Sequence, residues 1–206
     1  IAVVNGRISE DAFRRYLWVR PWLGPMLRLI DLFLMQTDVD ANRIIAMGAP
    51  AARVNVLGSL KWDASLTQRP TADVCEALAR RLGLRAGESL IVAGSTHRGE
   101  EQILLEALRS LRAQRPGVRL VIAPRHVERV GEVETLLRMD QLTVQRTSAI
   151  EAGSARWDIA IVDSVGQLPA YYAVATVAFV GGSLVPHGGQ NPLEPASLGK
   201  PVVFGP

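Results

Sequence analysis

The chain has 206 residues, of which 48% are hydrophobic and 21% are charged, so it can bury a core and is not a disordered polymer. Its net charge of +3 suits anionic partners, but aromatic residues make up only 5% and form no cluster among basic residues, which argues against nucleic-acid binding. The single cysteine, Cys75, excludes an internal disulfide, and we expect it to be a buried structural thiol. The opening IAVVNGRIS lacks the features of a signal peptide and the closing VVFGP indicates a buried strand with its turn, so we expect a fragment truncated at both ends.

Short apolar runs alternate with helical patterns along the chain, which predicts βαβ units around a parallel sheet that is buried on both faces. The predicted fold class is therefore α/β, doubly wound. In the first third, strands are expected at residues 2–4, 32–36 and 54–57, and helices at residues 10–19 and 38–47. Gly48 is expected to end the second of these helices.

A polar stretch with Pro70 interrupts this pattern between Asp63 and Thr71, as expected of an interdomain linker. We predict a first domain over residues 1–65, a linker over residues 66–71 and a second domain over residues 72–206. The second domain should contain strands at 90–93, 119–123, 142–145, 159–162 and 177–180, and helices at 72–82, 100–114, 127–139, 167–173 and from 192 onward. The uncharged stretch 168–186 approaches membrane-spanning length, but glycines and Pro186 interrupt it, so a helix plus a buried strand explains it better.

Ligands of open α/β sheets bind outside the carboxyl ends of the strands, and two early loops of the second domain have suitable residues there. In GSTH (94–97), backbone N–H groups and the hydroxyls of Ser95 and Thr96 can hold an anion, or one hydroxyl can merely cap the next helix. In PRH (124–126), Pro124 fixes the turn and the guanidinium of Arg125 can bind a phosphate or carboxylate. A solvated surface arginine is the alternative.

Two later loops offer similar choices. In DSVGQ (163–167), Ser164 can cap a helix, or Gly166 can allow close approach of a ligand to the backbone. In HGGQNPLEP (187–195), Asn191 at the N-cap, with Glu194 three residues later, fits a capping box. Alternatively, the carboxylate of Glu194 accepts hydrogen bonds from the two hydroxyls of a sugar diol.

Lys61 lies in GSLK (58–61), after the last strand of the first domain, and can offset charge on a leaving phosphate or be an ordinary surface lysine. The sequence contains no DxD-like metal pair near these loops, no nucleophile elbow and no phosphate-binding P-loop. Hydrolase and NTPase functions therefore lose support, and a transfer without a metal or cofactor from a nucleotide bearing a single phosphate remains workable.

Five segments together resemble one family: NGRISE (5–10), GSLKWD (58–63), GSTHRGEE (94–101), APRHVER (123–129) and VGGSLVPHGGQNPLEP (180–195). They are similar, in consistent order over nearly the whole chain, to the 3-deoxy-D-manno-octulosonic acid (Kdo) transferases. The resemblance implies the GT-B fold, with two Rossmann-like domains of which the first is incomplete here. The first would be the end of the acceptor-binding domain and the second most of the donor-binding domain.

The resemblance also implies a metal-independent inverting transferase that moves Kdo from CMP-Kdo onto a lipid A precursor at the cytoplasmic face of the bacterial inner membrane. Lys61 would help to stabilise the transition state, whereas the general base would lie upstream of Ile1, so the isolated chain should bind CMP weakly and transfer nothing. The residues implied to contact CMP are Pro124, Arg125, Val165, Gly166, Gln167, Asn191, Pro192, Leu193 and Glu194.

Three positions depart from the family pattern: Gln190 replaces a usual histidine, Gln167 a frequent glutamate, and Arg98 a common glutamate. Residues 13–35 mix arginines and tryptophans with apolar residues, as in helices that lie on a membrane surface, although Pro21 and Pro25 are expected to break such a helix. We expect peripheral membrane contact, with a packed helix carrying a solvated basic face as the alternative. The competing functions are a GT-B UDP-sugar transferase or epimerase, and a non-catalytic nucleotide-binding module.

Overall fold

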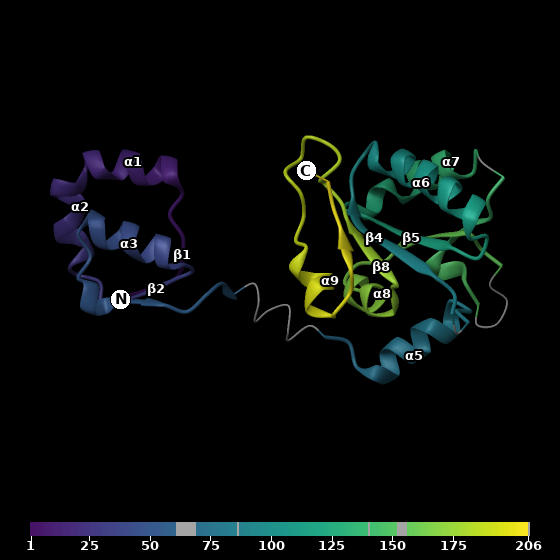
Figure 1. Cartoon of the computed structure of the whole chain (residues 1–206), viewed down its shortest axis with the longest axis horizontal. Coiled ribbons are helices and arrows are strands. Elements are labelled where there is room, and N and C mark those ends of the chain that lie inside the picture. The colour runs from purple at the N-terminus through teal and green to yellow at the C-terminus, as the bar shows by residue number, and fades with distance from the viewer. Residues whose placement is uncertain (61–68, 86, 140, 152–155, 206) are drawn as a thin grey trace. The chain divides into compact units, whose positions relative to one another are not determined.

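The computed structural model describes residues 1–60, 69–85, 87–139, 141–151 and 156–205. The chain divides into two compact units, Ile1–Ala64 and Ser65–Pro206, each built on a parallel sheet (Figure 1). The predicted α/β fold class is confirmed. The predicted linker lies partly outside the described residues, and the domain bounds expected from the sequence stay a prediction.

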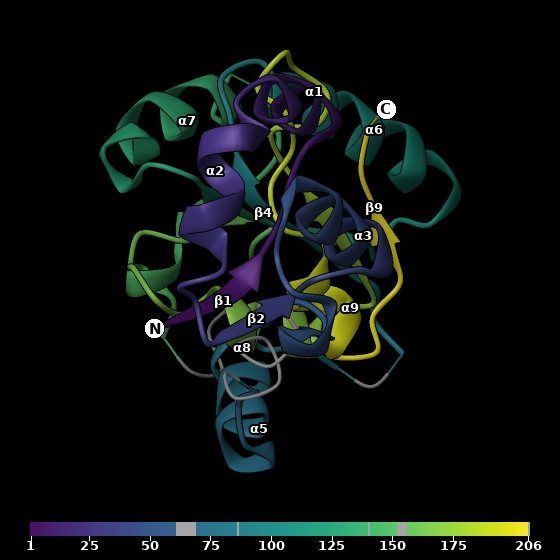
Figure 2. The ribbon, with the colours of Figure 1, turned by 90° about the vertical axis from the view of Figure 1, so that its left-hand side faces the viewer.

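The first unit has a three-stranded parallel sheet in the order β1-β2-β3, formed by β1 (Ala2–Gly6), β2 (Leu32–Met35) and β3 (Val54–Val56). Helices α1 (Glu10–Trp18), α2 (Arg20–Leu27) and α3 (Asp38–Met47) lie beside one another next to these strands (Figure 2), and a 3₁₀ turn, η1 (Ala51–Arg53), precedes β3. Phe33 and Met35 are buried in their shared core. The predicted helix end at Gly48 is confirmed, because this glycine adopts a φ of 119°.

Helix α2 was not expected from the sequence, since two prolines stood in its path. Pro21 lies in its first turn, where the missing N–H group has no intrahelical partner to lose. Pro25 lies inside the helix, so the prediction that it breaks the helix is wrong. The chain does break near Val19, which separates α1 from α2.

The second unit has a six-stranded, entirely parallel sheet in the order β6-β7-β5-β4-β8-β9. Its strands are β4 (Leu90–Thr96), β5 (Arg119–Pro124), β6 (Val144–Arg146), β7 (Ile159–Ile161), β8 (Val177–Val180) and β9 (Val202–Val203). Its helices are α5 (Ala72–Arg81), α6 (Glu100–Gln114), α7 (Val130–Leu137), α8 (Leu168–Val174) and α9 (Leu193–Ser197), with 3₁₀ turns η2 (Val127–Arg129) and η3 (Thr147–Ala149).

Helices cover both faces of this sheet (Figure 1). Helices α5 and α8 pack on one face through Leu82 and Tyr172, and α6 and α7 pack on the other through Leu108 and Leu137. Successive residues of a strand point to opposite faces, so β5 supplies Val121 to the first core and its neighbours to the second. The near-continuous apolar strands therefore reflect burial on both faces, as predicted.

Three expectations from the sequence are wrong. Strand β4 continues to Thr96, so most of the expected GSTH loop belongs to the strand. Cys75 is half-buried instead of buried. Strand β9 is not a buried strand, because Val203 is exposed at the edge of the sheet. The uncharged stretch 168–186 does form a helix and a buried strand, and among the described residues no helix is long and apolar enough to cross a membrane.

Candidate functional site

A pocket of about 260 Å³ opens at the carboxyl ends of the strands of the second unit. Four separate segments line it: the end of β4, the turn after β5, the loop between β7 and α8, and helix α9. Six of the residues predicted to bind substrate meet there, namely Ser95, Pro124, Arg125, Val165, Gly166 and Glu194. We call this the donor pocket, after the role that the sequence resemblance predicts for its residues.

Ser95 enters the pocket because β4 is irregular at this residue. Its φ is 55°, a left-handed conformation that few non-glycine residues adopt, and the pairing of β4 with β5 shifts register between Gly94 and Thr96. Such strain is held by surrounding structure and is frequent at functional sites. Gly181 explains why β8 can lie so close, since a Cβ atom on this glycine would be 2.3 Å from the carbonyl oxygen of Ser95.

The turn after β5 supplies Arg125, whose backbone N–H donates to the carbonyl oxygen of Thr96 at 3.0 Å. Its side chain is exposed and lines the pocket together with Pro124 and Val127. An exposed guanidinium at the rim of a pocket can bind an incoming phosphate or carboxylate with two parallel hydrogen bonds.

The loop after β7 is held from outside the pocket by Asp163, which accepts hydrogen bonds from the hydroxyls of Thr147 and Ser148 and from the backbone N–H of Ser148. Burial acts to raise the pKa of Asp163, but these hydrogen bonds outweigh it and keep the pKa below its usual value. Gly166 has a φ of 83° and open space around its missing Cβ, so a ligand can approach this backbone closely. Ser164 lines the pocket but does not cap α8, whose N-cap is Gln167, so the alternative of a cap at Ser164 is wrong.

Helix α9 presents Glu194 to the pocket from its first turn. Burial raises the pKa of this carboxyl group, while the charge of Arg125 and a hydrogen bond with the Asn191 side chain act in the opposite direction. The predicted capping box is wrong by one residue, because the N-cap is Pro192 and Asn191 instead accepts from the backbone N–H of Leu193 at 3.1 Å. Glu194 is therefore not needed to close a capping box.

Not every predicted residue meets at this pocket. Gln167 lines a separate apolar hollow against α5, and Pro192 lines a hollow formed by the glycine-rich loop 182–190. Asn191 and Leu193 do not line the pocket and are hydrogen-bonded to each other at the start of α9. Lys61 lies outside the described residues, and its role stays a prediction.

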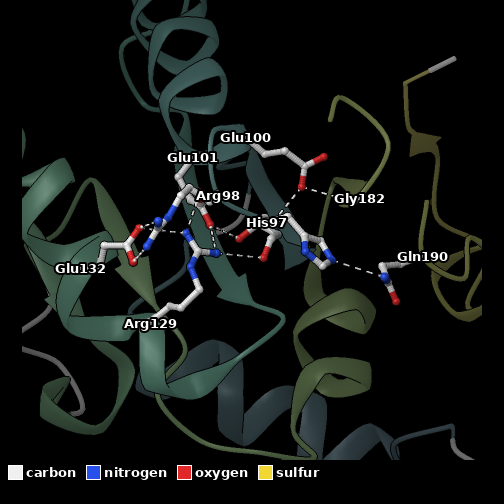
Figure 3. A network of polar contacts seen from close by, with 9 residues as sticks. His97, Arg98, Glu100, Glu101, Arg129, Glu132, Gly182 and Gln190 are labelled. Carbon is white, nitrogen blue, oxygen red and sulfur yellow. Dashed lines mark hydrogen bonds and ion pairs between the residues drawn. The ribbon is translucent and has the colours of Figure 1, made fainter. Parts of the chain in front are cut away.

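A polar network lies next to the donor pocket, at the start of α6 (Figure 3). Neither Ser95 nor Thr96 caps this helix, because its N-cap is Gly99. The carboxylate of Glu100 instead accepts four backbone N–H groups, from His97 and Gly182 at 2.8 Å each and from Ser183 and Leu184 at 3.0 Å each. The carboxylate of Glu101 accepts from Arg129 at 2.9 Å and from the Thr96 hydroxyl at 2.9 Å.

The three histidines of the chain gather beside this network. The His97 ring lies 3.9 Å from the His187 ring and 6.3 Å from the His126 ring, measured between ring centres. Burial, and then the charge of His187, lowers the pKa of His97. His97 also contacts the Gln190 side chain at 3.3 Å, so this buried ring has a polar partner.

Two of the positions that depart from the family pattern have structural partners of their own. Gln190 contacts His97, as just described, and the exposed Arg98 forms a two-fold ion pair with Glu132 at 2.7 and 3.1 Å (Figure 3). Neither lines the donor pocket.

The sequence did not indicate that Glu100 and Glu101 are buried, or that Tyr172 packs against Gly94. Acidic residues at a helix start are expected from the helix dipole alone, so adjacent glutamates gave no signal of burial. In the sequence, Tyr172 is one more residue of a predicted apolar helix. In the structure, burial and then the charge of Glu194 raise the pKa of its hydroxyl. A Cβ atom on Gly94 would lie 2.0 Å from the Tyr172 hydroxyl, and the glycine at that position was the available clue.

Comparisons with known proteins show which family the chain is similar to. Residues 1–64 match the family model described as 3-deoxy-D-manno-octulosonic-acid transferase (kdotransferase). The chain is 33% identical over 207 residues to a 3-deoxy-D-manno-octulosonic acid transferase of Haemophilus influenzae, in a match that covers 98% of this chain and 47% of that protein. It is also 34% identical to the crystal structure of the C-terminal CMP-Kdo binding domain of WaaA from Acinetobacter baumannii, with a TM-score of 0.59, over 70% of this chain and 72% of that one.

The chain belongs to the Kdo transferase family. A bifunctional glycosyltransferase/methyltransferase of Fusobacterium nucleatum is 36% identical over all of this chain and 31% of its own length. The chain thus spans less than half the length of these curated relatives. A putative UDP-N-acetylglucosamine 2-epimerase from Listeria monocytogenes, 16% identical with a TM-score of 0.53 over 98% of this chain and 49% of that one, shares the fold, which is of the predicted GT-B type.

Proposed function

We propose that the donor pocket binds the CMP portion of CMP-Kdo, and that the whole protein transfers Kdo to a lipid A precursor in lipopolysaccharide biosynthesis. The observation that carries this proposal is the convergence of six predicted ligand residues, from four separate segments, on one pocket. Membership of the Kdo transferase family supports it. On this proposal the first unit is part of the acceptor-binding domain and the second is the donor-binding domain.

The chemistry of the pocket suits a nucleoside monophosphate. The guanidinium of Arg125 and the hydroxyl of Ser95 provide donors for the phosphate. The carboxylate of Glu194 provides two acceptor oxygens for the ribose hydroxyls, and the backbone around Gly166 is open to close approach. The volume of about 260 Å³ fits a part of a sugar nucleotide instead of the whole donor.

In the proposed reaction, the bond between the anomeric carbon of Kdo and the phosphate oxygen of CMP breaks. A bond forms between that carbon and an acceptor hydroxyl oxygen with inversion, and the hydroxyl proton passes to a general base. CMP leaves with the bonding electron pair on its phosphate, where the positive charge of Arg125 stabilises it. Lys61 is predicted to add to this stabilisation.

We further propose that the first unit contacts the cytoplasmic surface of the bacterial inner membrane, where the lipid acceptor would lie. Trp18 and Trp22 on α1 and α2 are 86% and 73% exposed, and Leu29 after α2 is also exposed. Exposed arginines, including Arg15 and Arg20, lie close to them in the sequence. Tryptophan beside arginine is the composition of helices that bind anionic lipid surfaces.

Calorimetric titration of the chain with CMP and with UDP tests the donor assignment. CMP should bind more tightly than UDP. Glu194→Ala should weaken CMP binding by about tenfold through loss of the ribose hydrogen bonds, while the melting temperature changes little. Glu128→Ala removes an exposed carboxylate from η2 and should leave the CMP affinity and the melting temperature unchanged. Tighter binding of UDP would overturn the donor assignment in favour of a UDP-sugar enzyme. CMP binding without Kdo transfer by the full-length protein would favour a non-catalytic nucleotide-binding module.

A further inference from the structure

Two adjacent glutamates at the start of α6 are almost completely inaccessible to solvent, with Glu100 0% and Glu101 1% exposed. A buried carboxylate is costly unless its oxygens are satisfied, and these two are satisfied in different directions (Figure 3). We propose that Glu100 and Glu101 are positioning residues that fix the two opposite sides of the donor pocket. This inference rests on the proposed function for its consequence in nucleotide binding.

Glu100 acts on the chain that follows β8. Three of its four N–H partners, Gly182, Ser183 and Leu184, are consecutive residues of that segment. The loop closes on the same place, because the N–H groups of Gly189 and Gln190 donate to the carbonyl oxygens of Gly182 and Gly181. The carboxylate therefore holds the first end of the glycine-rich loop directly and the second end through these backbone hydrogen bonds, shortly before α9 presents Glu194 to the pocket.

Glu101 acts on the turn that follows β5. Both of its carboxylate oxygens accept from the Arg129 guanidinium, at 2.9 and 3.3 Å, and Arg129 lies in η2. The same turn contains Arg125 and Val127, which line the pocket. Glu101 also accepts from the Thr96 hydroxyl, so it ties this turn to the end of β4.

The strand order explains how one helix start can contact both loops. Strand β4 lies between β5 and β8 in the sheet, and α6 begins four residues after β4 ends. Neighbouring residues on a helix point about 100° apart, so one helix start can reach the loops on both sides. Arg125 and Glu194, the charged residues on those two sides, are thereby held at a fixed separation across the pocket.

Glutamine substitution tests this with little change in size. Glu100→Gln would keep one acceptor oxygen, but the new NH₂ group would face backbone N–H donors from which it cannot accept a hydrogen bond. Glu101→Gln would remove the negative charge opposite Arg129. Glu106→Gln is the matched control, because Glu106 lies exposed on the same helix and accepts only a side-chain hydrogen bond from Gln102 in the described structure.

Amide hydrogen exchange on the 206-residue chain, followed residue by residue with NMR, is the readout that does not depend on any ligand. Glu100→Gln should accelerate exchange at residues 182–184 and 189–190 by at least about tenfold, without the same change at residues 125–130. Glu101→Gln should accelerate exchange at residues 125–130 and spare residues 182–190. Uniform acceleration in both variants, or none, would overturn the proposal, because a merely structural role predicts no division between the two loops.

CMP titration of the same variants supplies the second arm. Both glutamine variants should bind CMP about tenfold more weakly than the parent chain, whereas Glu106→Gln should bind it equally well. Unchanged CMP affinity in the glutamine variants would overturn the proposal even if exchange changed. If the parent chain itself binds no CMP, the proposed function fails, and the divided exchange pattern alone then decides whether the two carboxylates position these loops.

Discussion

Beyond the end of β4, the chain on the β8 side and the chain on the β5 side are held by different kinds of contact. On the β8 side, backbone meets backbone: Gly181 lies so close to Ser95 that a Cβ would not fit, and Glu100 binds only N–H groups of the chain. On the β5 side, the Arg129 side chain links Glu101 with Thr96, and the exposed Arg125 side chain lines the rim of the pocket.

These two kinds of contact predict which positions tolerate substitution. A contact between backbones leaves no room for any side chain, since the backbone has few ways to move. Two side chains in contact can change rotamer and keep part of their interaction energy. The β8 side should therefore be intolerant of small substitutions that the β5 side accepts, although both sides contribute residues to one pocket.

The largest effect is expected for Gly181→Ala. The added methyl group would lie 2.3 Å from the Ser95 carbonyl oxygen and 2.7 Å from Cα of Thr96, so one of the two strands must move. We expect the free energy of unfolding to fall by about 3 kcal/mol, measured by urea denaturation. Gly131→Ala on α7, where a Cβ would meet open space, should instead raise it by about 0.5–1 kcal/mol. Equal effects of the two substitutions would contradict the distinction.

An intermediate effect is expected for Arg129→Lys on the β5 side. Lysine keeps the charge opposite Glu101 but cannot donate to both carboxylate oxygens and the Thr96 carbonyl in one plane. We expect a loss of about 1–2 kcal/mol in the free energy of unfolding, smaller than for Gly181→Ala. A larger loss than for Gly181→Ala would show that the β5 side is the more rigid one.

The smallest effect is expected from pH. Burial raises the pKa of Glu194 in the free protein, and hydroxyl donors from a bound ribose would favour its ionised form. CMP affinity should therefore fall by about threefold as pH is lowered from neutrality through the raised pKa, measured by calorimetric titration at each pH. The phosphate of CMP also titrates in this range, so Glu194→Gln is the control. An identical pH dependence in both proteins would remove Glu194 from the ribose site.

Much of this fold could be predicted from the sequence, because the apolar periodicity is strong. Helices such as α3 and α6 begin and end where the pattern places them, and the parallel sheet follows from strands buried on both faces. The end of β4 was misplaced because Gly94 and Ser95 resemble loop residues. Only tertiary contact with Tyr172 explains why a glycine is required at position 94 within the strand.

The donor pocket was predictable in part for a similar reason. Residues that follow parallel strands meet at one edge of the sheet, which brought Arg125, Gly166 and Glu194 together as expected. The roles of Glu100 and Glu101 could not be foreseen. Their partners lie about 80 and 30 residues away in the chain, and one carboxylate is satisfied by backbone groups, which leave no signature in the sequence.

The most direct test is to map CMP on the chain by NMR, following the backbone amide shifts during titration. We expect the largest shifts at Ser95, Arg125, Gly166 and Glu194, around the donor pocket of the second unit. Shifts centred instead on the hollow lined by Gly188 and Phe204, or spread without a centre, would contradict this expectation.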